Sequence, residues 1–344
     1  MMKALVLEEY NKFVYKEMPE PEITERDVLI QVKACGICGS DVHGMDGSSG
    51  RRIPPLIMGH EASGIIVKTG SRVQNFSEGD PVTFDSTIYC GECFYCRKGL
   101  INLCDNRRVL GVSCGDYRQH GAFAEYVAVP EHILYRMPDG LSFEQAAMIE
   151  PVSIAFHAIE LTPTSLNDTA VVVGAGMIGL LVIQALRTAG CGTIIAVDLE
   201  QNKLDLALQL GADKALRVDH VDVPADIQTH TDNRGATIAV ECVGNTAAVN
   251  TAISSLRKGG SLTLVGNLAS TVEFPLQAAV TRQIRIQGSC SSCGEYPACL
   301  DMIARGTIDV DVLKSQVAPL AEGASWFERL YNKEPGLMKV ILVP

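Results

Sequence analysis

The pattern of apolar and polar positions changes near the middle of this 344-residue chain. Before about residue 151, apolar residues alternate with polar ones in short runs that are separated by Gly, Pro and Asp. Residues 27–33 and 64–67 are examples. Alternation with a period of two is typical of β-strands that bury one face. The first part of the chain is therefore predicted to be a β-rich domain.

From about residue 152, continuous apolar runs alternate with segments of helical periodicity. Such runs, rich in Val, Ile and Leu, are typical of strands buried on both faces of a parallel sheet. They lie at residues 170–173, 193–197, 215–218, 237–241, 261–265 and 284–288. Strands joined by helical crossovers predict a doubly wound parallel sheet, so the fold class is α/β.

The pattern changes once more after residue 289. We expect a helix around residues 296–303, an amphipathic helix with one apolar face, and a final strand at residues 339–342. The apolar face comprises Trp326, Phe327, Leu330 and Tyr331. We expect this segment to return to the first domain. The predicted domains are then residues 1–151 with 290–344, and residues 152–289.

A glycine-rich turn follows the first strand of the second domain. Gly174, Gly176 and Gly179 form a G-x-G-x-x-G motif that also contains Met177 and Ile178, and an unbroken helical segment follows. The first glycine permits the tight turn, the second lets a pyrophosphate approach backbone N–H groups, and the third lets the helix pack on the strand. The positive end of the helix then faces the phosphates. Strand, turn and helix together predict a dinucleotide site.

An acidic residue ends the next predicted strand. Asp198 lies 22 residues beyond Gly176, where dinucleotide-binding domains place the acid that binds the ribose hydroxyls. A carboxylate there repels a 2′-phosphate, and Leu199 follows it where an arginine would accept one. The sequence therefore favours NAD over NADP. Lys203 is a second candidate for the ribose, although a solvated helix lysine is an equally good interpretation.

Charge and composition exclude several classes of partner. The net charge is −11, and no basic block is longer than Arg51-Arg52 or Arg107-Arg108, so neither a nucleic acid nor an anionic membrane is expected. No secretory signal is visible, and the apolar stretch at residues 170–183 is shorter than the ~20 residues that span a bilayer. The spacing of the 12 cysteines indicates metal binding rather than disulfides, which predicts a reducing cytoplasm.

Four cysteines lie close together in a C-x2-C-x2-C-x7-C array, at Cys90, Cys93, Cys96 and Cys104. Four thiolates can close a tetrahedral zinc site with no open position, which is a structural role. An iron–sulfur cluster is the alternative. The bacterial cluster signature has a shorter last gap and a proline after the final cysteine, whereas Asp105 follows here. We therefore predict a structural zinc.

A second set of candidate metal ligands is dispersed along the chain, at Cys38, His60, Glu61 and Glu150. A cysteine, a histidine and a carboxylate with one open position form a catalytic zinc site, in which thiolate and carboxylate neutralise the metal. Cys35 and Cys38 also form a C-x-x-C that would suit a redox pair. No thioredoxin-like helix follows, however, and that interpretation leaves His60 and Glu150 without a role.

Together these motifs resemble the medium-chain, zinc-dependent alcohol dehydrogenases. Over nearly the whole chain the resemblance is to the polyol dehydrogenase branch, which includes sorbitol-like and galactitol-phosphate-like enzymes. It is carried by residues 38–43, residues 59–64, the four-cysteine array, Glu150-Pro151 with His157, and the glycine motif. It implies a GroES-like catalytic domain, a Rossmann domain and hydride transfer between a secondary alcohol and NAD. It also implies a homodimer or homotetramer, with the edge strand 284–288 as a candidate contact.

The resemblance assigns roles at the metal. Cys38, His60 and Glu150 are the implied zinc ligands, and Glu61 is a second carboxylate that binds or exchanges at the metal. Which of the two glutamates is the resting third ligand stays open. Asp41 is either a group that orients a ligand such as His60 or a turn-forming side chain.

It also assigns roles in the reaction. Ser40 corresponds to the hydroxyl that hydrogen-bonds the substrate oxygen, and His43 to the end of the proton relay. Two segments that pass the nicotinamide correspond to residues 265–267 and 289–291. Their candidate cofactor contacts are Val265, Asn267, Ser289 and Ser291.

The exact substrate stays open because two groups that grip polyol hydroxyls are missing. Sorbitol dehydrogenases of this branch usually have a tyrosine after the histidine of the first motif and an Arg-Tyr pair near the C-terminal segment. This chain has Gly44 and Ser291-Ser292. A polyol, polyol phosphate, sugar acid, diol or cyclitol fits as well as sorbitol. Arg51 and Arg52 could meet an anionic substrate, although a solvated loop is the simpler interpretation.

Alternative functions remain. An L-threonine or short-chain diol dehydrogenase of the same superfamily fits the same motifs. A zinc-free reductase would lack Cys38, His60 and Glu150. A non-enzymatic NAD- and zinc-binding protein would be expected to have lost Ser40 and His43.

Overall fold

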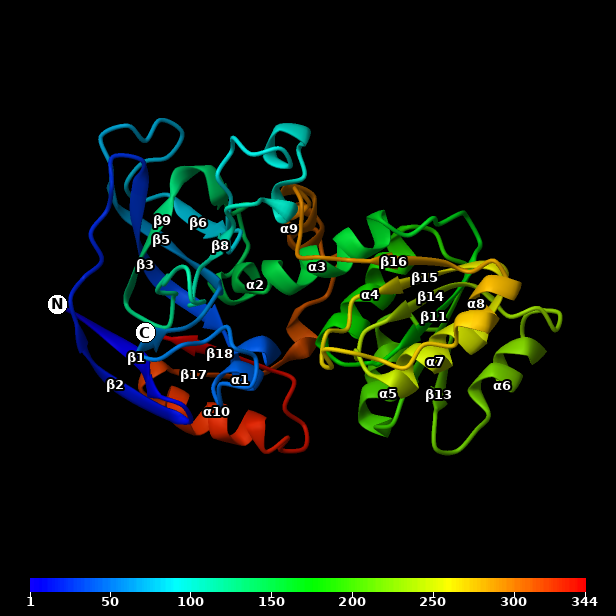
Figure 1. The fold of residues 1–344 in the computed structure, drawn as a ribbon. Helices are drawn as coiled ribbons and strands as arrows, with labels where there is room; N and C mark the ends of the chain where they lie inside the picture. Colours follow the sequence, from blue (N-terminus) through cyan, green and yellow to red (C-terminus); the bar gives the residue numbers. More distant parts are fainter. The chain divides into compact units, whose positions relative to one another are not determined.

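The structure is a computed structural model that describes residues 1–344. The chain forms two compact units, each with its own core (Figure 1). The first unit contains Met1–Glu150 and Tyr296–Pro344, and the second contains Pro151–Glu295. The final segment, from Tyr296, thus belongs to the same unit as the first 150 residues.

The first unit is built mainly from antiparallel strands. Its strands are β1 (Met2–Glu9), β2 (Lys12–Met18), β3 (Asp27–Gly36), β4 (Leu56–Ile57), β5 (Glu61–Thr69), β6 (Pro81–Phe84), β7 (Thr87–Ile88), β8 (Arg108–Val109), β9 (Tyr126–Pro130), β10 (Leu134–Arg136), β17 (Lys314–Pro319) and β18 (Lys339–Val343). Its α-helices are α1 (Gly39–Gly44), α2 (Phe143–Ala147), α9 (Tyr296–Ala304) and α10 (Gly323–Tyr331), while α3 (Ile149–Glu160) begins here and continues into the second unit. Short 3-10 turns occur at Cys96–Lys98, Ile101–Leu103, Glu131–Ile133, Asp311–Leu313 and Leu320–Glu322.

A seven-stranded sheet organises this unit, with the order β10-β6-β5-β3-β18-β17 and β9 also paired with β3. The long strand β3 pairs antiparallel with both β5 and β18. A second sheet has three strands, in the order β2-β1-β4. Apolar side chains from both sheets and from α10 fill one core.

Helix α10 closes that core as its amphipathic pattern predicts. The Phe327 ring is fully buried, stacks on Phe13 at 4.3 Å between centroids and meets Phe123 edge-on. Tyr331 differs from the prediction, because it is 42% exposed and its hydroxyl donates to Asp46. The buried face therefore ends before Tyr331.

The second unit is a doubly wound sheet. Its strands are β11 (Thr169–Val173), β12 (Thr193–Asp198), β13 (Lys214–Arg217), β14 (Ala236–Glu241), β15 (Leu256–Leu264) and β16 (Arg285–Gly288), and the helices are α4 (Met177–Thr188), α5 (Gln201–Gln209), α6 (Val223–Thr229), α7 (Thr246–Ser255) and α8 (Leu276–Thr281).

All six strands are parallel and run in the order β13-β12-β11-β14-β15-β16. Numbered along the chain this order is 3-2-1-4-5-6, the arrangement of dinucleotide-binding Rossmann folds. The predicted fold class is confirmed.

Candidate active site and metal sites

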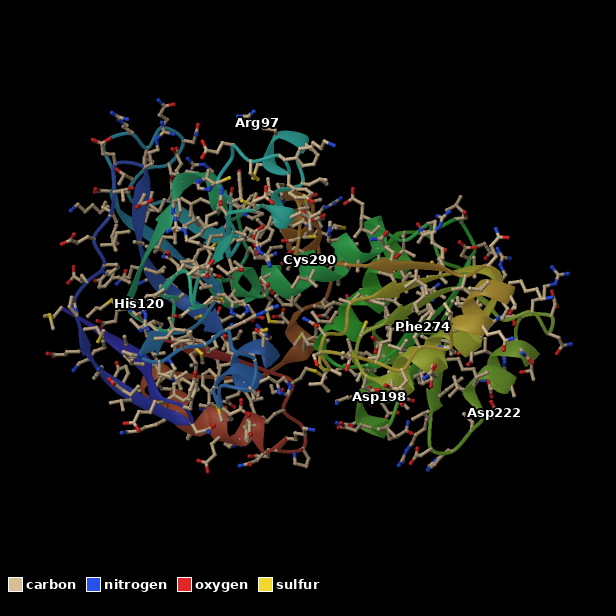
Figure 2. The ribbon with its side chains drawn as sticks, in the orientation of Figure 1. Arg97, His120, Asp198, Asp222, Phe274 and Cys290 are labelled. Carbon is tan, nitrogen blue, oxygen red and sulfur yellow. The ribbon has the colours of Figure 1, made fainter.

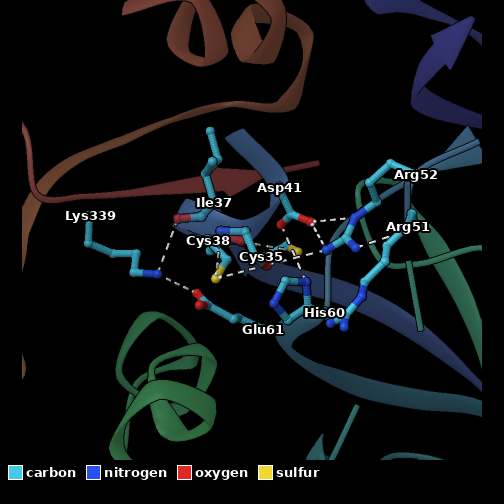
Figure 3. Close-up of polar contacts among 11 residues, drawn as sticks. Cys35, Ile37, Cys38, Asp41, Arg51, Arg52, His60, Glu61 and Lys339 are labelled. Atoms are coloured by element: carbon cyan, nitrogen blue, oxygen red, sulfur yellow. Dashed lines mark hydrogen bonds and ion pairs between the residues drawn. The ribbon is translucent and has the colours of Figure 1, made fainter. Parts of the chain in front are cut away.

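The register of three strands brings distant parts of the chain to one end of the large sheet. Gly36 ends β3 and pairs with Glu61, the first residue of β5, on one side and with Ile341 of β18 on the other. Cys38 follows β3, His60 precedes β5, and Lys339 begins β18. Because β5 and β18 both run antiparallel to β3, these residues gather at the same end of the sheet (Figure 3).

Cys38, His60 and Glu61 form a group of possible metal ligands, since their donor atoms all lie within 4.8 Å of one another. Cys38 is the N-cap of α1, and its sulfur accepts the Ser40 N–H at 3.4 Å. Helix α1 also carries His43, which is exposed. The sequence-predicted Cys, His and carboxylate donors are thus brought together.

The Asp41 carboxylate lies behind His60. Its Oδ2 is 3.3 Å from His60 Nδ1, and its Oδ1 accepts from Arg52 Nε and Nη2 at 3.2 and 2.9 Å. Burial disfavours the ionised carboxyl, but His60 and Arg52 outweigh it and hold the pKa of Asp41 below its ordinary value. Asp41 is fully buried, so the ligand-orienting interpretation is favoured over a turn-forming one.

Glu61 is held on one side only. Its Oε2 accepts from Lys339 Nζ at 2.6 Å, and Lys339 also donates to the Ile37 carbonyl at 3.1 Å. A Cβ on Gly36 would lie 2.4 Å from Glu61 Oε2, so glycine leaves room for this carboxylate. Burial lowers the pKa of Lys339, but Glu61, Cys38 and Glu150 together outweigh it and raise that pKa above the ordinary value.

The second carboxylate oxygen of Glu61 indicates that this site binds a cation. Glu61 Oε1 is buried and has no hydrogen-bond partner, which is costly for a charged group unless a metal or a donor satisfies it. A thiolate, an imidazole and a carboxylate oxygen are the three kinds of ligand that zinc accepts in sites with one open position. The residues present therefore fit a catalytic zinc.

Glu150 stands beside this group near the start of α3. Burial raises the pKa of Glu150 to about 7, with His60 opposing and Glu61 reinforcing the shift. The donor atoms that lie within 4.8 Å of one another include one from Glu61 and none from Glu150. The structure therefore favours Glu61 as the third ligand, and substitution of each glutamate can test this choice.

The four cysteines of the predicted structural site also come together, with their sulfurs all within 4.8 Å. Backbone N–H groups point at the sulfurs, as when Cys90 N donates to Cys104 Sγ at 3.3 Å. Donation from the backbone of Glu92 and Cys93 lowers the pKa of Cys90 to about 6. Phe94, Leu100 and Leu103 are exposed, so this lobe has little apolar core, and the donors fit a zinc that holds it together.

In the second unit, the glycine turn has the predicted geometry. Gly174 has φ +96°, and a Cβ on Gly179 would lie 1.8 Å from the Gly174 carbonyl oxygen. Gly176 is the N-cap of α4, and no side chain caps the first N–H groups of this helix. A Cβ on Gly176 would have no atom within 4 Å. The turn leaves backbone N–H groups of α4 accessible, which fits a pyrophosphate.

Asp198, labelled in Figure 2, ends β12 beside this turn. Its Oδ2 accepts from Ala175 N at 2.6 Å, and its Oδ1 accepts from Leu199 N at 2.7 Å and Glu200 N at 3.0 Å. Three backbone N–H groups therefore fix the carboxylate beside the glycine turn. Lys203 pairs with Glu200 at 2.6 Å, which supports its solvated-helix interpretation.

The two predicted nicotinamide segments follow β15 and β16. Val265 N donates to Glu241 O, Asn267 is exposed, and Ser289 N donates to Leu264 O. Ser289 Oγ is buried without a hydrogen-bond partner, which marks it as a candidate ligand contact. Ser291 has the left-handed φ of +55°.

Sequence reasoning missed two charged residues of the first unit. Arg52 is 4% exposed and bound to Asp41, so its interpretation as part of a solvated loop is wrong, while Arg51 is exposed as expected. Lys339 falls in the predicted last strand, and the sequence indicates no role for it. Its partner Glu61 lies 278 positions earlier in the sequence, and a lysine at the start of an apolar strand is the only local signal.

Comparison with known proteins agrees with both units. Residues 24–139 match the family model of the alcohol dehydrogenase GroES-like domain, and residues 178–305 match that of zinc-binding dehydrogenases. The sorbitol dehydrogenase of Bacillus subtilis (strain 168) is 35% identical over 348 aligned residues, which cover 100% of this chain and 97% of that protein. The chain belongs to the zinc-dependent medium-chain alcohol dehydrogenases.

Solved structures of other members of the family resemble this dehydrogenase over its full length. Galactitol-1-phosphate dehydrogenase from Escherichia coli has a TM-score of 0.92 at 26% identity, with complete coverage of both chains. A zinc-binding dehydrogenase from Sinorhizobium meliloti 1021, bound to NADP, has a TM-score of 0.91 at 31% identity and covers 100% of this chain and 99% of its own.

Membership makes this dehydrogenase a zinc-dependent oxidoreductase that acts on a small-molecule alcohol with a nicotinamide dinucleotide as its second cofactor. The expected GroES-like domain and Rossmann fold are confirmed. None of its helices has the length and the apolar character that crossing a bilayer requires.

Proposed function

We propose that this dehydrogenase oxidises a secondary alcohol of the polyol, polyol phosphate or sugar-acid type with NAD. The observation that carries the proposal is the group formed by Cys38, His60 and Glu61, in which one buried carboxylate oxygen lacks a partner. The substrate class rests on similarity to sorbitol dehydrogenase, to the D-arabitol-phosphate dehydrogenase of Enterococcus avium, and to the L-idonate 5-dehydrogenase of Vitis vinifera.

In the first unit, Cys38, His60 and Glu61 would hold the catalytic zinc, with Glu150 as the alternative carboxylate. When bound, zinc supplies Lewis acidity that lowers the pKa of an alcohol. Ser40, at the start of α1, hydrogen-bonds the substrate oxygen and accepts its proton while it gives up its own hydroxyl proton to the relay. His43, exposed on the same helix, is the residue that passes this proton to solvent.

In the second unit, the backbone at Gly174, Gly176, Met177, Ile178 and Gly179 binds the pyrophosphate. Asp198 binds the adenosine ribose and disfavours a 2′-phosphate, which supports NAD rather than NADP. Residues Val265, Asn267, Ser289 and Ser291 line the nicotinamide, and Lys203 is the weakest member of the proposed set.

These roles divide the chain into a catalytic domain at residues 1–151 and 290–344 and a cofactor domain at residues 152–289. The division after Glu150 and after Glu295 supports similar boundaries. We also propose a homodimer or homotetramer in the cytoplasm. Strand β16, an edge strand with all four residues exposed, supports assembly through this sheet.

A substrate panel tests the proposal. The zinc-loaded protein is incubated with NAD or NADP and with polyols, polyol phosphates, sugar acids, diols and L-threonine, and NADH or NADPH formation is followed by absorbance. We expect turnover of a polyol-type substrate with NAD. With NADP we expect a kcat/KM at least tenfold lower, which corresponds to a difference of about 1.4 kcal/mol in activation free energy. Exclusive turnover of short diols or of L-threonine would instead support those alternatives.

Matched cysteine variants connect turnover to the proposed site. Cys38→Ser removes a proposed zinc ligand and is expected to abolish turnover while the protein stays folded. Cys114→Ser, which lies outside both groups of metal ligands, is expected to behave as the unsubstituted protein. Full activity of Cys38→Ser would remove the proposed centre.

A further inference from the structure

Arg52 is a buried arginine that contacts two residues of the candidate site. It lies between α1 and β4, and its guanidinium reaches Asp41 Oδ1 through Nε and Nη2. The same Nη2 is 3.3 Å from Ser40 Oγ. Figure 3 shows this guanidinium beside Asp41, on the side of the group that also contains His60. One side chain therefore joins the carboxylate behind a metal ligand to the hydroxyl proposed for the substrate.

The contact with Arg52 determines which way the Ser40 hydroxyl can donate. A guanidinium only donates hydrogen bonds, so Ser40 Oγ must be the acceptor of this one. The hydroxyl hydrogen is then directed to another acceptor, which in this structure is Cys38 Sγ at 3.3 Å. A hydroxyl so oriented lies next to the ligand sulfur.

Gly44, the last residue of α1, provides the space for the Arg52 side chain. A Cβ at position 44 would lie 2.5 Å from Arg52 Cγ and 3.5 Å from Arg52 Cβ. Cγ is near the backbone, and the far end of the side chain is held by Asp41 and Ser40, so the stem has little freedom to move. Gly44 does not have a positive φ, so the backbone itself does not require glycine there.

We propose that Arg52 is a positioning residue for the reaction, which fixes the Ser40 hydroxyl and the Asp41 carboxylate together, and that Gly44 is the space its stem requires. The proposal rests on the proposed function, because it takes Ser40 as the group that meets the substrate oxygen. It explains why Gly44 replaces the tyrosine usual in sorbitol dehydrogenases. A side chain at position 44 and Arg52 in this conformation exclude each other.

Kinetics of conservative variants test the positioning role. Arg52→Lys keeps a positive charge beside Asp41 but cannot present several donors in a fixed plane. It is expected to retain zinc and melting temperature, to lower kcat about tenfold and to change KM by less than about threefold. Ser40→Ala is expected to lower kcat strongly in the unsubstituted protein and much less in Arg52→Lys, because the two residues act as one unit. Fully additive effects of the two substitutions would overturn the proposal.

A second cycle tests the Gly44 contact without using activity. Gly44→Ala is expected to lower the melting temperature in the unsubstituted protein because it displaces the Arg52 stem. In the Arg52→Ala background the contact with Arg52 Cγ is gone and only the 3.3 Å approach to Ser49 Oγ, the end of a short side chain, is still tight; alanine is also a better helix former than glycine. There Gly44→Ala is expected to leave the melting temperature unchanged or to raise it. The same loss in both backgrounds would show that Arg52 is not what Gly44 accommodates, and would overturn that part of the proposal.

The two cycles separate this inference from the proposed function. If no alcohol is oxidised even by the unsubstituted protein, the proposed function fails, while the melting-temperature cycle still reports whether Gly44 and Arg52 are coupled. If the protein is active and Arg52→Lys retains full kcat, the proposed function stands and the positioning role of Arg52 is wrong.

Discussion

At the scale of single residues, buried charges of opposite sign surround the candidate metal ligands. Asp41 lies between Arg52 and His60, and Lys339 lies between Glu61 and the Ile37 carbonyl. Burial alone would neutralise such groups, whereas a close partner keeps each one charged. Arg52 and Lys339, the charged groups behind the ligands, are therefore already paired with Asp41 and Glu61. Among the oxygens of the three proposed ligands, Glu61 Oε1 is buried without a hydrogen-bond partner and can bind a metal.

A pair of glutamate variants identifies the third metal ligand. Glu61→Gln replaces the orphaned carboxylate oxygen with an amide, and is expected to lower zinc affinity at the catalytic site at least about tenfold. Glu150→Gln, a matched change beside the same group, is expected to keep that zinc. Zinc content after dialysis against a weak chelator measures both. Loss of zinc from Glu150→Gln alone would assign the ligand role to Glu150.

Cofactor choice depends on one carboxylate. Asp198→Ala removes the charge that repels a 2′-phosphate, so the ratio of kcat/KM for NAD over NADP is expected to fall about tenfold, equivalent to ~1.4 kcal/mol. The control is Asp205→Ala, an exposed acid on α5. An unchanged ratio in Asp198→Ala would remove the assigned role, since the carboxylate would then serve only its three backbone N–H donors.

At the scale of elements, the four-cysteine lobe and the end of β14 depend on polar groups rather than on apolar packing. The lobe has two short 3-10 turns and several exposed apolar side chains. Glu241, at the end of β14, is fully buried and accepts from the N–H groups of Val243 and Gly244, both at 2.7 Å. For each element, one substitution is therefore expected to raise or lower the stability in a direction that can be predicted.

The lobe is expected to lose its stability with its metal. Cys93→Ser removes one of four donors, and is expected to lower the melting temperature by about 5 °C, as for a loss of ~2 kcal/mol. It is also expected to open the segment between Cys90 and Cys104 to proteolysis. Cys114→Ser is the matched control. Equal melting of Cys93→Ser and the unsubstituted protein would argue against a structural zinc.

The end of β14 is expected to make stability depend on pH. Burial raises the pKa of Glu241, with the two N–H donors opposing the shift. The folded state then binds this proton more tightly than the unfolded state, so the stabilisation is present below the unfolded pKa and is lost as the pH rises through the folded pKa. Glu241→Gln stays neutral at every pH. Its melting temperature relative to the unsubstituted protein is expected to rise between about pH 5 and about pH 8.

The exposed Glu22 is the matched control for this measurement. Glu22→Gln is expected to show the same difference from the unsubstituted protein at both pH values. A difference for Glu241→Gln that does not change with pH would mean that Glu241 is not the group responsible.

At the scale of the whole molecule, the sequence predicts the architecture well because each strand of the Rossmann sheet is marked locally. Apolar runs at residues 170–173 and 193–197 correspond closely to β11 and β12, and the glycine turn adopts its expected conformation. The surroundings of the metal ligands are predicted less well. Lys339 acquires its role from strand register, and no local pattern reports that β18 lies beside β3. Arg52 acquires its role from the path of the chain after α1, which returns its side chain to Asp41.

Assembly is the other property of the whole molecule that one strand controls. In β16, which forms an edge of the Rossmann sheet, Ile286 is 38% exposed. If this edge joins protomers, Ile286→Lys is expected to shift the mass measured by light scattering toward the monomer. Val317→Lys is the matched control, because β17 is an edge of the other sheet and Val317 is 41% exposed. Dissociation by Val317→Lys alone would place the contact on the first unit.

Strand β18 has a consequence for biosynthesis. It lies between β3 and β17, yet it is formed by residues 339–343, which are translated after every strand of the Rossmann sheet. While the Rossmann sheet is being made, β3 has no neighbour on that side and Glu61 has no lysine beside it. The nucleotide-binding unit can therefore finish folding before the unit that contains β3 is completed.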